Sequence, residues 1–283
     1  MFIDSLDVSG GGAMYKLLLV SDQDDVLNAF ASVENWELHG FKAPHIRHDF
    51  EGTVDSLAKH HADGICIAVS PEQEERIIDY LQEFFPDVPI FDPGHTEEEV
   101  LRYLYELRTL LNRIHADYSN ERIDLRGKLQ SIRHEYFRKL IKGEVLSSND
   151  LHRNMRLLRS RMDADRPCLL IQIAESVDID KLEGRWHEGR DRLEVALRNS
   201  FSGDLNGFHI LPTVHSDGRI LVLACPLHGV DIEMTVDDMT AMLTNYSAEC
   251  IAHMKDFFGV ELHISEIRVL PALTSLCGET DQS

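Results

Sequence analysis

In the first third of the chain, short apolar runs alternate with segments in which apolar residues recur at the spacing of a helix. The runs YKLLLV, GICIAV and VPIFD have the length and the polar flanks of buried strands, and FKAPHI is a weaker strand of the same kind. Between them, apolar residues recur at helical spacing in residues 26–33, 53–60 and 71–85. Pro71 opens the last of these segments, where a helix tolerates a missing N–H. Strands that alternate with helices predict a parallel sheet covered by helices on both faces.

Residues 97–143 contain no proline and carry apolar side chains at alternating spacings of three and four. After one missed step at Glu121 the pattern resumes, and a repeat sustained over about four to five heptads is typical of a coiled coil. We therefore expect a long helical coiled-coil linker over residues 97–164 that forms a homodimer. The alternative is a helix that packs on its own domain, and Glu121 and Gly127 mark where the helix would break. The expected dimer interface consists of Leu104, Leu107, Leu111, Ile114, Tyr118, Leu125, Leu129, Ile132 and Tyr136.

The last part of the chain changes pattern again. RPCLLIQIAE is an apolar strand, and a helix is expected over residues 181–200. FHILPTVH and RILVLAC flank the tripeptide SDG, which predicts a hairpin with Asp217 and Gly218 at its turn. A helix over residues 235–258 and the strand VELHISEIRVL complete the order. This β-α-β-β-α-β order predicts an α+β domain of the ferredoxin-like type, with helices on one face of an antiparallel sheet.

These patterns give the expected domain organisation. The first residues are acidic and then rich in glycine, so they predict a flexible leader, with Met14 as an alternative start. They lack the order of a signal peptide. No apolar run approaches the ~18 residues of a membrane span, so no membrane association is expected. The expected segments are a leader (1–13), an α/β domain (14–96), a helical linker (97–164), an α+β domain (165–272) and a tail (273–283).

The net charge of −21 is unevenly distributed along the 283 residues. Residues 1–101 hold 5 basic and 21 acidic side chains, residues 102–161 hold 14 and 7, and residues 162–283 hold 9 and 21. A nucleic-acid-binding module is basic within a compact unit, so we expect no direct DNA binding from this chain alone. The basic middle segment could instead attract the acidic domains of its own chain, an interaction that salt should weaken.

Five cysteines are scattered along the chain without a CxxC pair. An odd number in scattered positions, three of them in apolar runs, suits reduced and buried thiols better than a disulfide framework. We therefore expect a cytoplasmic protein. The cysteines are Cys66, Cys168, Cys225, Cys250 and Cys277.

Few residues of the sequence are candidates for metal binding or catalysis. Asp22, Asp24 and Asp25 follow the first strand, where a parallel sheet binds ligands, and they could hold Mg²⁺. The alternative is that they stabilise the positive end of the following helix dipole. Cys250 and His253 lie within one helical turn and could begin a zinc site, but no second pair has ligand spacing. We expect neither a metal nor a cofactor.

Residues 15–68 resemble the first half of a response-regulator receiver domain, as in YesN-like regulators that carry an AraC-type DNA-binding tail. The resemblance includes the segment NWELHGFK and its spacing to ADGICIA. It places the family's acidic pair on Ser21 and Asp22 and the phospho-accepting aspartate on Ala68. If VPIFDP is the last strand, the lysine position holds Asp92. The resemblance thus implies a shortened, flavodoxin-like pseudo-receiver, with one helix and one strand missing, that cannot form an acyl phosphate.

The resemblance continues through HEYFRKLIKGEVLSSNDLHRNMRLL and into residues 166–270, which are similar to a degenerate cyclase-like domain of the GGDEF type. Gln172 and Ala174 stand where an active cyclase has acidic groups, and HSDGRI replaces GGDEF. Cyclase chemistry needs carboxylates that hold two metal ions, so the resemblance implies no cyclase activity. Family members carry a helix-turn-helix pair after the last strand, and the tail here is too short for one.

We therefore expect a cytoplasmic, non-enzymatic signalling or transcription-regulatory protein. It would act through dimerisation and through contacts with a protein or a small ligand, independently of phosphorylation. An enzyme is the competing class, either a divergent receiver phosphorylated on Asp22 or Asp24 or a weak nucleotide-processing domain. A DNA-binding regulator is the third class, and it would show salt-dependent affinity for duplex DNA.

Overall fold

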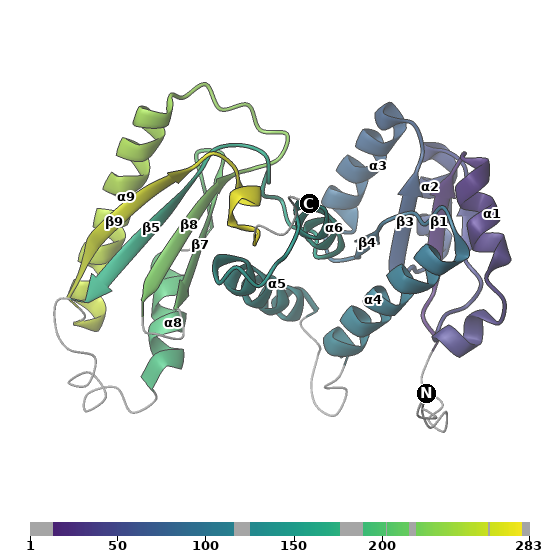
Figure 1. The fold of residues 1–283 in the computed structure, drawn as a ribbon, viewed down its shortest axis with the longest axis horizontal. Coiled ribbons are helices and arrows are strands. Elements are labelled where there is room, and N and C mark those ends of the chain that lie inside the picture. The colour runs from purple at the N-terminus through teal and green to yellow at the C-terminus, as the bar shows by residue number, and fades with distance from the viewer. Residues whose placement is uncertain are drawn as a thin grey trace. The chain divides into compact units, whose positions relative to one another are not determined.

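Figure 1 shows a computed structural model of the chain, which divides into two compact units. The first unit comprises Met1–Leu129 with Arg156–Arg159, and the second comprises Gln130–Met155 with Ser160–Ser283. The structure describes residues 14–115, 125–175, 189–201, 203–214, 219–259 and 261–278.

A parallel sheet of four strands forms the centre of the first unit (Figure 1). The strand order is β2-β1-β3-β4, and β1 and β3 are buried at every position, as expected of central strands covered on both faces. Ser21 pairs with Ala68, so β1 and β3 end at the same edge of the sheet. The predicted parallel sheet is confirmed. Its strands are β1 (Leu17–Ser21), β2 (His45–Arg47), β3 (Gly64–Ala68) and β4 (Ile90–Phe91).

Helices cover both faces of this sheet. Leu57, Ile77 and Leu81 bring α2 and α3 onto the face that carries Ile65 and Ile67. The other face carries Gly64 and Cys66 and packs against α4, which also contacts α1. The elements are α1 (Asp24–Ser32), η1 (Trp36–His39), α2 (Phe50–Lys59), α3 (Pro71–Phe84) and α4 (Glu97–His115).

The apolar stripe of α4 is buried within a single chain. Leu104, Leu107, Leu111 and Ile114 are each at most 4% exposed. A Cβ atom placed on Gly64 would lie 2.7 Å from Leu107 Cδ2, so the stripe packs against β3. A surface already buried in one chain cannot form an interface with a second. The expectation that these four residues form a dimer interface is corrected in favour of the alternative, a helix packed on its own domain.

The rest of the expected linker is divided between the two units. Its helices are α5 (Leu125–Ile141) and α6 (Ser148–Leu157), and from Gln130 to Met155 they belong to the second unit. Among the remaining expected interface residues, Leu129 is buried, while Ile132 and Tyr136 keep part of their surface exposed. Tyr118 lies outside the described residues, and Leu125 is described by its backbone only.

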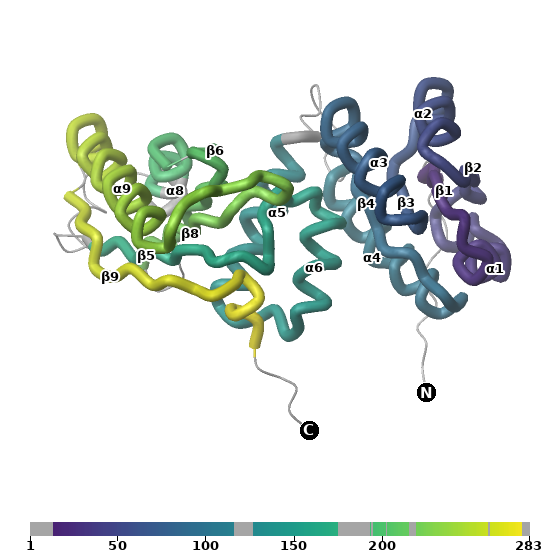
Figure 2. Tube along the Cα trace, turned by 90° about the horizontal axis from the view of Figure 1, so that it is seen from above, coloured from purple at the N-terminus to yellow at the C-terminus, as the bar shows by residue number. Residues whose placement is uncertain are grey.

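An antiparallel sheet of five strands forms the second unit, in the order β6-β7-β8-β5-β9. β9 lies at its edge beside β5 (Figure 2). The predicted strand and helix order is confirmed, with one short additional strand, β6. The elements are β5 (Cys168–Glu175), α8 (Gly189–Ser200), β6 (Gly203–Leu205), β7 (Phe208–Val214), β8 (Ile220–Pro226), α9 (Val236–Phe258) and β9 (Leu262–Leu270).

Local signals explain several of these boundaries. The hydroxyl of Thr235 accepts from the Asp238 N–H at 3.1 Å and begins α9, and Gly259 ends it at a φ of 68°. β7 and β8 pair from Phe208–Pro226 to Val214–Ile220, as a hairpin requires. The turn expected at Asp217 and Gly218 lies outside the described residues.

Helices cover both faces of the second sheet, where the sequence predicted one covered face. α8 and α9 lie on one side and α5 on the other (Figure 1). Phe137 and Leu140 from α5 and Leu151 and Met155 from α6 form a buried cluster with sheet residues such as Leu223. The sheet face that the sequence predicted to lack helices is therefore covered by α5 and α6, which belong to the segment predicted to be a linker.

The segment after β9 is ordered from its first residues, although the sequence predicted a tail. A 3-10 helix, η2, spans Leu273–Leu276, and the side chain of Leu273 is fully buried. The N–H of Gly278 donates to the carbonyl of Val145 at 2.9 Å, which ties this segment to the chain between α5 and α6. Within the described ranges, no helix combines the length and the apolarity needed to cross a bilayer.

Replacing Leu104 with alanine should lower the free energy of unfolding of the first unit by about 2–4 kcal/mol, because the change leaves a cavity under α4. Hydrogen exchange of the β1 and β3 amides in urea measures this loss. Tyr105→Ala is the matched control, since Tyr105 is 73% exposed and should change stability by less than about 0.5 kcal/mol. Equal losses in the two variants would contradict the packing of this stripe on the sheet.

His134 on α5 makes the stability of the second unit depend on pH. Its side chain is 7% exposed, and its Nδ1 has no hydrogen-bond partner among the described residues. Burial, followed by electrostatic interactions with Arg198, His209 and two arginines of α5 itself, Arg138 and Arg133, lowers its pKa from 6.5 to about 4.

Because the folded pKa is depressed, the contribution of neutral His134 is present above pH 6.5 and is lost as the pH falls toward 4. We expect the urea midpoint of the second unit to drop between pH 7 and pH 4.5, and the drop to be smaller in His134→Leu. An identical pH dependence in the wild type and in this variant would show that His134 does not titrate as described.

Candidate functional site

The candidate site lies at the carboxyl ends of β1 and β3, where Ser21 and Asp22 follow the first strand. The Ser21 side chain is fully buried, and its hydroxyl accepts from the Gln23 N–H at 3.1 Å. His48 Nδ1 donates to the Ser21 carbonyl at 2.7 Å, which fixes the same turn from the β2 side. Asp22 is exposed. Ser21 therefore shapes the turn into α1, and Asp22, the next residue, presents a carboxylate to solvent.

Ala68 ends β3 directly opposite Ser21 and is 5% exposed. A methyl group has no lone pair with which to attack phosphorus. The nearest thiol on the same strand belongs to Cys66, which is fully buried, and burial raises its pKa above the usual range. A thiol that stays protonated is a poor nucleophile. Neither Ala68 nor Cys66 thus offers a group that readily takes up a phosphoryl group.

Asp92 follows β4 and comes together with Glu74 of α3 around one guanidinium. Arg156 Nη2 donates to Glu74 Oε1 at 2.5 Å and to the Ile67 carbonyl at 3.5 Å. Arg156 Nη1 lies 3.9 Å from Asp92 Oδ1. The Arg156, Glu74 and Asp92 side chains are 29%, 33% and 28% exposed, so water screens this group only in part. The structure thus places an arginine beside the position where the resemblance puts a receiver's lysine.

Sequence reasoning identified Asp92 but missed Glu74 and Arg156. Arg156 stands 82 positions after Glu74, and no local pattern reports a contact over that separation. One signal did point in this direction. Arg156 lies in the basic segment 102–161, and both of its partners lie in the acidic residues 1–101, which is the attraction that the charge distribution suggested.

The remaining acidic residues after β1 act at the start of α1. Asp24 and Asp25 occupy its first turn, where negative charge interacts favourably with the helix dipole. His95 Nδ1 donates to Asp25 Oδ2 at 2.7 Å, and this hydrogen bond lowers the pKa of Asp25. In the described part of the chain, no three His, Cys, Asp or Glu side chains are grouped as metal ligands would be. These observations favour the alternative to a Mg²⁺ site.

The second unit presents no comparable cluster in its described residues. Gln172 and Ala174 lie on β5, where the sheet ladder pairs them with Glu266 and His263 of β9. On α9, the Cys250 thiol donates to the Ser200 carbonyl at 3.0 Å, and the His253 ring packs against Phe257. Cys250 and His253 thus have separate partners.

Comparison of the chain with protein-family models and with curated protein sequences finds no match. The receiver and cyclase-like resemblance therefore stays a prediction, and the argument about function depends on the geometry alone.

A double-mutant cycle tests the ion pair at the strand end. We expect Arg156→Ala and Glu74→Ala to show a coupling energy of about 1 kcal/mol in the stability of the first unit, because the pair is partly shielded from water. Arg76 and Glu51 form the matched control at 3.1 Å, and their side chains are 50% and 71% exposed. Their coupling should be below about 0.5 kcal/mol. Equal coupling in both cycles would remove any special role of Arg156.

Proposed function

We propose that this protein is a non-enzymatic, cytoplasmic regulatory protein whose first unit passes signals by contact, without phosphorylation. In this proposal the first unit keeps the sheet and helices of a receiver-like domain and has lost its switch. The second unit is a cyclase-like domain that serves as a binding module. The partner is a protein or a small ligand that contacts the first unit.

The observation that carries the proposal is the end of β3. Its last residue is Ala68, which faces Ser21, a buried residue whose hydroxyl already accepts a backbone hydrogen bond. Acyl phosphate formation needs a carboxylate positioned at such a strand end, and an adjacent cation to stabilise the charge that develops on phosphate. The nearby cation here, Arg156, is engaged with Glu74 and Asp92.

Dimerisation is a separate part of the proposal. The stripe on α4 does not provide the interface, because it is buried within one chain. Of the expected interface residues with described side chains, Ile132 and Tyr136 keep exposed surface. Any self-association proposed here therefore involves surfaces outside the α4 stripe.

Incubation of the full chain with acetyl phosphate and Mg²⁺, followed by intact mass spectrometry, tests whether the first unit can be phosphorylated. We expect the mass to stay unchanged, while a phosphorylatable receiver treated in parallel gains one phosphoryl group. Asp22→Asn and Asp24→Asn are the control variants, since these exposed carboxylates are the remaining acceptors that the sequence suggested. A phosphoryl adduct that disappears in either variant would establish the competing class, a divergent receiver.

A further inference from the structure

Cys168 and Cys225 lie across from each other on two neighbouring strands. β5 and β8 are antiparallel, and Leu169 pairs with Ala224, so the next step of the ladder sets Cys168 opposite Cys225. Directly opposite residues of such strands have Cβ atoms about 4.5–5.5 Å apart, and a disulfide bridges Cβ atoms about 3.5–4.5 Å apart. A bond between the two sulfur atoms therefore needs only a small movement of the backbone.

Both thiols are free and fully buried. Burial, followed by a hydrogen bond with Cys168, raises the pKa of Cys225. Since the thiolate is the reactive form, neither sulfur reacts readily while the site stays closed. The two thiols thus lie opposite each other, within a small backbone movement of a disulfide, and are protected from forming one.

The protection comes from the helices α5 and α6. Phe137 and Leu140 from α5 and Leu151 from α6 belong to the buried cluster that contains both cysteines. α6 is only 10 residues long and contributes Leu151 and Met155 to this cluster. Short elements with few buried contacts are the ones that open locally before a domain unfolds.

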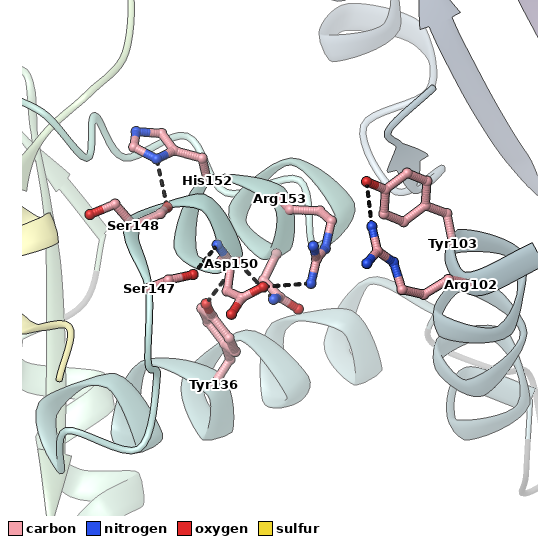
Figure 3. Close-up of polar contacts among 9 residues, drawn as sticks. Arg102, Tyr103, Tyr136, Ser147, Ser148, Asp150, His152 and Arg153 are labelled. Carbon is pink, nitrogen blue, oxygen red and sulfur yellow. Dashed lines mark hydrogen bonds and ion pairs between the residues drawn. The ribbon is translucent and has the colours of Figure 1, made fainter. Parts of the chain in front are cut away.

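The Tyr136 hydroxyl links α5 to the start of α6, and further polar contacts lie within the start of α6 itself (Figure 3). The Tyr136 hydroxyl points from α5 to α6 and donates to the Asp150 carbonyl at 3.4 Å. The Ser147 hydroxyl accepts from the Asp150 N–H at 3.1 Å, and Arg153 donates to the Asp150 carboxylate at 2.7 Å. The bond from Tyr136 joins the two helices near the start of α6, so its loss should weaken the cover without changing the sheet.

We propose that Cys168 and Cys225 form a reversible cross-strand disulfide, and that displacement of the α5–α6 cover controls its formation. The oxidant is a small disulfide such as oxidised glutathione. One cysteine loses its proton and attacks a glutathione sulfur, which releases one glutathione thiolate and leaves a mixed disulfide. The second cysteine loses its proton, attacks the protein sulfur and displaces the other glutathione thiolate. Two S–H bonds are lost, one S–S bond forms and the oxidant is reduced to two thiols.

The other cysteines are not placed to compete with this pair. Cys66 lies on β3 in the first unit, and Cys250 lies on α9, which covers the opposite face of the second sheet. Cys277 belongs to the segment after β9 and is partly exposed, so it is the thiol that a reagent reaches first. The inference does not depend on the proposed function, because it concerns the second unit only.

The test uses the full chain with Cys277→Ser, so that the exposed thiol takes no part. After reduction, incubation with oxidised glutathione and alkylation of the remaining thiols in denaturant, we expect one intrachain link, so that the chain lacks two alkyl groups relative to the fully reduced and alkylated chain. Peptide mapping should join Cys168 to Cys225. The link should be absent in Cys168→Ser and in Cys225→Ser, and it should persist in Cys250→Ser. No link, or a link between other cysteines, would overturn the proposal.

A pair of matched variants tests whether displacement of α5 and α6 controls the formation of the disulfide. Leu151 on α6 and Leu243 on α9 are at most 1% exposed and lie on opposite faces of the sheet. Leu151→Ala should raise the rate of linking about tenfold, and Leu243→Ala should raise it less than about twofold. Tyr136→Phe, which removes only the hydroxyl bonded to Asp150, should raise the rate about threefold. Equal rates in the two alanine variants would show that global unfolding, and not opening of the cover, exposes the thiols.

Discussion

The burial of β3 between two layers of helices determines what the first unit can do. Every residue of this strand is buried, so its side chains are committed to packing, and only the end of the strand approaches solvent. In a parallel sheet that end is where chemistry is carried out. Here the strand closes with the methyl group of Ala68. The last residue of β3 thus supplies no nucleophile, and in the function proposed here an effect on the rest of the chain comes from binding.

Electrostatics around the strand end support the same conclusion. Arg156 faces two carboxylates and a backbone carbonyl, so its charge is already balanced within the first unit. A partner that brings an anion to this edge has to compete with Glu74 and Asp92. Since the groups are partly exposed, each contact is modest in energy and sensitive to salt. An interaction of this strength suits a reversible contact better than a permanent structural bond.

The sequence predicted the elements of both units better than their packing. β1 and β3 were predictable because buried strands are continuously apolar. α9 was predictable because Thr235 caps its start and Gly259 ends it. The stripe on α4 was misinterpreted because a spacing of three and four is common to coiled coils and to helices packed on a sheet. Spacing reports that a face is buried and does not report what buries it. For the same reason, the sequence did not reveal that α5 and α6 pack on the second sheet. The contact of Arg156 with Glu74 spans 82 positions, so no local sequence pattern could predict it.

The central proposal is that the end of β3 does not support phosphoryl chemistry. The most direct measurement is a series of amide NMR spectra recorded while Mg²⁺ and beryllofluoride, a mimic of a bound phosphoryl group, are added to the full chain. We expect no saturable shifts at the amides of Ser21, Asp22 and Ala68. Saturable shifts confined to these amides would show that the site still accepts a phosphoryl group, and would contradict the account.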